Sequence, residues 1–186
     1  MLVTFRNGLL FAAMLGVLLL LPASGQAANV TSTGTVTGSV LSASTSATPS
    51  FSANLDSGDS TQTYTVPLTI QDTRGTGAGW NMTITSTTFT TGGGSPNLLS
   101  TTASSLTGVT SSCSTGTCTN PANAQTYPIT VPAATSAPTA VKFFNTTANN
   151  GMGRFTVTPT VGVTIPQNAF AGTYTSTVTL SIVSGP

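Results

Sequence analysis

Apolar side chains alternate with threonine along most of this chain from residue 60 onward. The same period of two recurs in six runs, which place on one face Tyr64, Val66, Leu68 and Ile70; Trp80, Met82 and Ile84; Tyr127, Ile129 and Val131; Phe155 and Val157; Val161, Val163 and Ile165; and Tyr174, Val178, Leu180 and Ile182. This spacing is typical of strands with one buried face. No helical periodicity follows residue 28, and glycine-rich turn clusters separate the runs. We expect an all-β protein, a single antiparallel β-sandwich (Ig-like/Greek-key type) of seven to ten strands.

Two details refine this expectation. Pro67, Pro128 and Pro132 fall inside or beside the runs, so those strands should lie at sheet edges or contain bulges, since proline cannot donate to a ladder. The Thr/Ser-rich opening segment, residues 29–48, is either a linker or contains a first strand, which Val30, Val36 and Val40 suggest.

The N-terminal region has the order of a secretory signal peptide. Arg6 precedes an apolar run at residues 9–21, and the small residues of "PASGQA" follow. The apolar run is short for a membrane span, so we expect a signal peptide at 1–27 and a sandwich domain at 28–186. An uncleaved N-terminal anchor is the alternative. Either way the sequence predicts an exported protein.

The composition excludes several classes of function. Charged residues make up 4% of the chain, against about a quarter in an ordinary protein, so a basic nucleic-acid surface is absent. There is no histidine and no glutamate, which removes the usual nucleophilic triads and histidine metal sites. We therefore expect no enzyme, no cofactor and no metal. Asp56 and Asp59 could bind calcium, but two acidic residues make a poor cage and a polar turn is the simpler interpretation.

The segment "DTRGTGAGWNMTIT" holds the candidate binding residues: Asp72, Arg74, Trp80 and Asn81. Trp80 shares its parity with Met82 and Ile84, which favours a core position. An exposed ligand platform is the alternative, with Asn81 on the opposite face. Asp72 and Arg74 could form an ion pair that pins the turn, or Arg74 could cover the Trp80 ring.

The two cysteines, Cys113 and Cys118, are close together in "CSTGTC". In an exported chain such a pair is expected to oxidise to a small disulfide loop. A redox-active pair would more typically be Cys-x-x-Cys beside a charged neighbour, which this segment lacks.

Two blocks of the sequence resemble the WxL domain of bacterial surface proteins. The first is the Asp-x-Arg pair, glycine-rich turn and Trp80-Asn-Met82; the second is the ending "AGTYTSTVTLSIVSGP". Met82 stands where the family has leucine, and Val178 stands where it has a second, distal tryptophan. The resemblance implies a β-rich domain that associates non-covalently with the bacterial cell wall.

These observations lead to two functional hypotheses. The first is a secreted, non-enzymatic surface protein that attaches to peptidoglycan or to other cell-wall components or surface proteins. The second is a structural subunit of a coat, filament or layer, which self-assembles through strand edges because few charges block strand addition.

Overall fold

The computed structural model describes residues 31–186, so the predicted signal peptide lies outside the described residues. Within them, Val36–Pro186 forms one compact unit, and no helix is long and apolar enough to span a bilayer. Its elements are β1 (Leu41–Ser44), the 3-10 turn η1 (Leu55–Ser57), β2 (Ser60–Thr65), β3 (Leu68–Asp72), β4 (Trp80–Thr87), β5 (Ser104–Thr115), β6 (Ile129–Thr130), β7 (Ala133–Ala134), β8 (Val141–Asn145), β9 (Gly153–Ile165) and β10 (Val178–Ser184).

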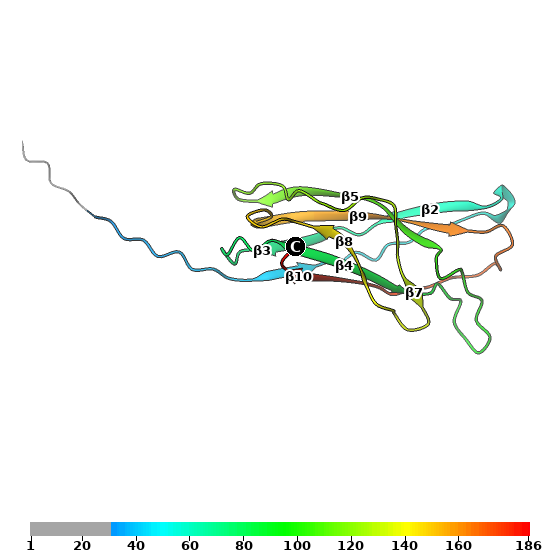
Figure 1. The fold of residues 1–186 in the computed structure, drawn as a ribbon. Coiled ribbons are helices and arrows are strands. Elements are labelled where there is room, and N and C mark those ends of the chain that lie inside the picture. Colours follow the sequence, from blue (N-terminus) through cyan, green and yellow to red (C-terminus); the bar gives the residue numbers. More distant parts are fainter. Residues whose placement is uncertain (1–30) are drawn as a thin grey trace, which may run out of the picture. The chain divides into compact units, whose positions relative to one another are not determined.

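The strands form two sheets, which confirms the predicted antiparallel β-sandwich. One sheet has the order β1-β3-β9-β5-β6, with β2 also paired to β9, and the other has the order β10-β4-β7, with β8 also paired to β4. The only parallel ladder in the described residues joins β4 to the two-residue strand β7. Figure 1 shows β5 and β9 side by side in one layer and β4 and β10 in the other.

Strand β9 organises the first sheet. It pairs with β5 along one side, and with β2 and then β3 along the other. The run at residues 60–70, expected as one strand, is two strands broken at Pro67. Val66 donates its N–H to the carbonyl of Pro159 at 3.1 Å. In an antiparallel ladder the N–H and C=O of one residue point toward the same neighbouring strand. Pro159 therefore lacks its N–H on the side where β2 has ended and β3 has not begun, so the proline interrupts no ladder.

The other prolines predicted to sit at edges or irregularities do flank very short strands. Pro128 precedes β6 and Pro132 precedes β7, each of two residues. The Pro132 carbonyl accepts a hydrogen bond from the Ser86 N–H at 2.9 Å. These prolines therefore limit the length of the strands beside β4 and β5 without leaving Ser86 unpaired.

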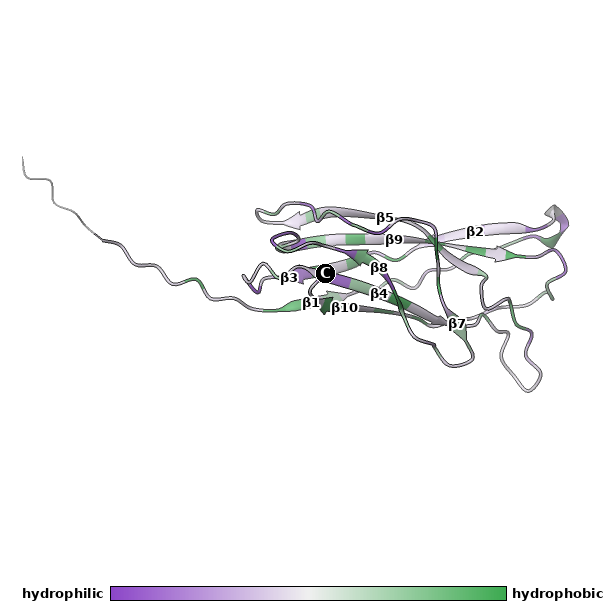
Figure 2. Cartoon of the chain, viewed as in Figure 1, coloured by the Kyte–Doolittle hydropathy of each residue, from purple (hydrophilic) through white to green (hydrophobic). Residues whose placement is uncertain are grey.

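The alternating residues of the long runs fill the core. The larger cluster centres on Trp80, which stacks on Phe144 of β8 with ring centroids 5.2 Å apart and also contacts Phe155 of β9. A second cluster around Tyr64, Val161 and Val163 lies under β2. Figure 2 shows strands that are mainly near-white with green bands, as expected when threonine covers the outward positions.

Several strands differ from the expectation. The runs at residues 155–157 and 161–165, expected as two strands, form the single strand β9. A first strand does lie within residues 29–48, but Leu41 and Ala43 of β1 pack on the core, whereas Val36 is 98% exposed. Val30 lies outside the described residues. Strands β5, β7 and β8 lie outside the six alternating runs. Cys113 belongs to β5, which continues to Thr115.

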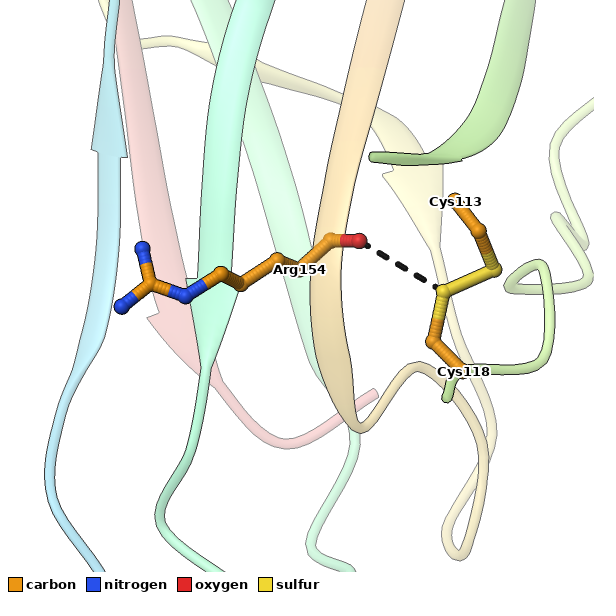
Figure 3. Close-up of a disulfide and its surroundings, with 3 residues drawn as sticks. All are labelled: Cys113, Cys118 and Arg154. Atoms are coloured by element: carbon orange, nitrogen blue, oxygen red, sulfur yellow. Dashed lines mark hydrogen bonds between the residues drawn. A yellow bond between two sulfur atoms is a disulfide. The ribbon is translucent and has the colours of Figure 1, made fainter. Parts of the chain in front are cut away.

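Cys113 and Cys118 form a disulfide with their Cα atoms 6.0 Å apart. Cys113 lies near the end of β5, and Cys118 packs against the larger core cluster. In Figure 3 the Arg154 side chain points away, and only its carbonyl oxygen faces the Cys118 sulfur, at 3.5 Å. This is a contact rather than a donated hydrogen bond, because a disulfide sulfur carries no proton. The disulfide therefore holds the chain after β5 against β9.

Replacing Trp80 by alanine should lower the free energy of unfolding by about 3–5 kcal/mol, because the ring is fully buried and its removal leaves a cavity. Urea titration measures the loss, and the control Leu98→Ala, at a 58% exposed side chain, should cost less than about 0.5 kcal/mol.

The native protein should also show blue-shifted tryptophan emission that iodide quenches poorly. Red, easily quenched emission would contradict the buried placement.

Replacing both cysteines by serine should leave the sandwich folded and lower its stability by about 2 kcal/mol, the chain-entropy value for so short a loop. Thermal denaturation of the double variant measures this change. Intact mass before and after reduction and alkylation tests the bond itself in the wild type. Free thiols in freshly exported protein would show that the loop is open.

Candidate functional site

The four candidate binding residues lie together at one end of the sandwich. Asp72 is the last residue of β3, and Trp80 and Asn81 begin β4. The register pairs Trp80 with Ser184 at the end of β10 and Asp72 with Gly153 at the start of β9. The glycine-rich turn that carries Arg74 connects β3 to β4 and so passes from one sheet to the other.

Arg74 is a clamp between these elements. Its Nε and Nη2 atoms donate to the two carboxylate oxygens of Asp72, both at 2.9 Å, and Nη2 also donates to the Gly79 carbonyl at 2.8 Å. Nη1 donates to the Ser184 hydroxyl. The Asp72 side chain is 2% exposed and that of Arg74 15%. Hydrogen bonding to Asp72 raises the pKa of Arg74, so the guanidinium stays charged and holds β3, the turn and β10 together.

Trp80 is held by its backbone as well as by its ring. Its indole Nε1 donates to the Gly151 carbonyl at 2.8 Å, and its backbone N–H donates to the Thr146 hydroxyl at 2.8 Å. Gly151 has a φ of 75°, and a Cβ there would lie 2.7 Å from Nε1, so only glycine fits. The aromatic contacts of the ring are with Phe144 and Phe155, not with Arg74. Trp80 is thus a core residue with no face open to a ligand.

Asn81 points to the opposite face of β4 and is also buried, with 8% of its surface exposed. Its Nδ2 donates to the Gly185 carbonyl at 2.8 Å. The side chain therefore ties the C-terminal residues to β4.

This end of the molecule offers structural hydrogen bonds rather than reactive groups. The polar side chains of Asp72, Arg74, Trp80 and Asn81 all have partners within the protein. What remains accessible is the turn itself, where Gly75 and Thr76 are exposed. The structure brings the candidate residues together, and any ligand contact here would use the surface of the turn that they support.

The other acidic residues sit in the turn around η1. Asp59 accepts a hydrogen bond from the Gln167 backbone N–H at 2.8 Å, and the Asn54 side chain caps η1 through the Asp56 N–H. Residues 31–186 contain no group of three potential metal ligands. The geometry is that of a polar turn.

A cavity at the other end of β4 was not recognised from the sequence. It has a volume of about 830 Å³ and lies between residues 45–55 and 169–180. Aromatic residues such as Phe51, Phe89 and Phe170 line it, and they lie outside the alternating runs. Large aromatic residues outside the strand runs are visible in the sequence, but their spacing does not predict that they lie around one cavity.

Replacing Arg74 by alanine should lower the free energy of unfolding by about 3 kcal/mol, because it leaves the buried Asp72 carboxylate without its cation. Arg74→Lys should recover only part of this loss, since lysine keeps the charge but not the two-pronged geometry. Urea titration measures both variants. The control is Arg154→Ala, at an exposed side chain; an equal loss in the control would contradict the clamp.

One comparison with known proteins identifies the chain. The family model described as "WxL domain surface cell wall-binding" matches residues 26–186. Searches of curated proteins and of solved structures found no significant match. The matched family is a cell-wall-binding one, which places the protein outside the cell, at the cell surface. Since the match spans nearly the whole chain that follows the predicted signal peptide, the protein belongs to the WxL domain family of cell-wall-binding surface proteins.

Proposed function

We propose that the domain attaches non-covalently to peptidoglycan through uncharged contacts, without catalysing a reaction. The observation that carries the proposal is how the few charges are used. Arg74, one of three cations in residues 31–186, is neutralised by Asp72 inside the fold. Lys142 and Arg154 remain at the surface, too few to bind anionic wall polymers by counterion release.

Hydroxyl, amide and apolar groups are then the available means of attachment. The outward positions of β2, at Thr61, Thr63 and Thr65, are exposed and uncharged. Glycan strands of the wall present complementary hydroxyl and amide groups. Such hydrogen bonds are far less sensitive to salt than exposed charge pairs.

A second function is favoured by one specific feature. Residues 107–115 of β5 pair with β9 on one side, and in the described residues no strand pairs with their other side. This edge carries no proline and no charge, two of the devices that usually prevent strand addition, and its register shifts lie only near its two ends. Assembly of a coat or filament through this edge is the alternative proposal.

The purified mature protein should co-sediment with isolated peptidoglycan, and the retained fraction should change little between roughly 50 and 500 mM salt, a range over which exposed charge pairs are screened. A Lys142→Gln, Arg154→Gln double variant is the matched control and should bind like the wild type. A steep fall with salt, or loss of binding in the double variant, would contradict uncharged attachment.

Size-exclusion chromatography and electron microscopy of the same preparation separate the two functions. Monomers that sediment with the wall support attachment. Regular filaments or layers, together with no sedimentation at any salt concentration, would favour the coat subunit.

A further inference from the structure

The cavity of about 830 Å³ lies where the sandwich is open at its edge. Strand β2 pairs only with β9, and β10 pairs only with β4, so no ladder of the described residues closes the space between these two strands. The segments at residues 45–55 and 169–177 pass over the opening and form its walls. Its volume is within the range of small-ligand sites, about 300–1,000 Å³.

Aromatic rings form a floor and one rim of this cavity. Phe51 stacks on Tyr64, with centroids 6.0 Å apart and ring planes 7° apart, and meets Phe89 edge-on at 5.6 Å. At the rim, Phe170 is 69% exposed, and its carbonyl accepts a hydrogen bond from the Tyr174 hydroxyl at 2.9 Å. The stacked rings of Phe51 and Tyr64 and the exposed ring of Phe170 give a ligand two apolar surfaces.

Tyr64 provides an unused polar group inside the cavity. Its side chain is 8% exposed and lines the cavity, and its hydroxyl has no hydrogen-bond partner among residues 31–186. No buried polar side-chain atom of the described residues lacks a partner, so this hydroxyl is open to solvent in the cavity, where a ligand acceptor can take the place of water. Burial raises the pKa of Tyr64 to about 12, and the group is a neutral donor at any pH below that value.

The rest of the lining restricts the ligand class. None of the lining residues is charged, which disfavours an anionic or cationic ligand. Hydroxyls of Thr48, Ser50, Ser52 and Thr173 line the walls. A sugar ring matches this mixture, because its C–H faces pack on aromatic rings while its hydroxyl and amide groups form hydrogen bonds at the edges.

We propose that this cavity binds a neutral glycan, with the Tyr64 hydroxyl as a hydrogen-bond donor and the rings of Phe51 and Phe170 as packing surfaces. The inference rests on the proposed wall attachment and assigns its contact to this cavity rather than to the turn before Trp80.

The test uses the mature protein and a soluble, uncharged N-acetylglucosamine tetramer, titrated by calorimetry or NMR. Tyr64→Phe removes only the hydroxyl and should weaken binding about fivefold. Its melting temperature should not fall, because the hydroxyl has no partner to lose. Phe170→Ala should weaken binding about tenfold or more, and Leu98→Ala, an exposed apolar residue outside the cavity, should bind like the wild type.

Failure of this inference is distinguishable from failure of wall attachment. If the wild type and both cavity variants sediment equally with peptidoglycan, the cavity assignment is overturned while attachment stands. If the tetramer does not bind but a single-chain fatty alcohol does, the glycan assignment is overturned. If the wild type binds the tetramer and the cavity variants lose it, the inference is supported whether or not whole peptidoglycan sediments the protein.

Discussion

Burial of the Trp80 ring is the interaction on which the two sheets depend. The ring stacks on Phe144 of β8 in its own sheet and reaches Phe155 of β9 in the opposite sheet. Its indole N–H is fixed by the Gly151 carbonyl. Because only 4% of the chain is charged, few ion pairs can form, and apolar burial has to supply most of the stability of the fold. The largest ring of the chain therefore occupies the junction of the sheets.

The two ends of β4 differ in what they leave available. At the Trp80 end, the ion pair of Arg74 with Asp72 and the Asn81 hydrogen bond use up the polar side chains internally. At the other end, the edges of β2 and β10 are not joined, and a cavity with the unpartnered Tyr64 hydroxyl remains. The WxL family is cell-wall-binding, and our proposal assigns the contact with the wall to the open end.

The alternation of apolar and polar residues predicted the strands that have one face in the core and the other toward solvent. In β3 and β9, Ile70 and Phe155 face the core while Thr69 and Thr156 face outward. Strand β8 escaped prediction because the adjacent Phe143 and Phe144 are both buried. A register shift between β4 and β8 at Phe143 breaks the period of two, and Asn123 and Tyr127 hydrogen-bond to the β8 backbone. Strand β5 escaped because its apolar residues Leu106 and Val109 are three positions apart across a register shift, which gives no contrast of period two.

The sequence by itself determined the all-β class, the inward parity of Trp80, Met82 and Ile84, and the near absence of charge, because these depend on local spacing and composition. Tertiary structure decided that the Arg74 guanidinium forms its hydrogen bonds with Asp72 and Ser184, inside the protein. It also brought Phe51, Tyr64 and Phe170 to one cavity. Periodicity states which face of a strand is buried, but which distant loops cover that face is set by long-range packing and strand order, for which local spacing carries no signal.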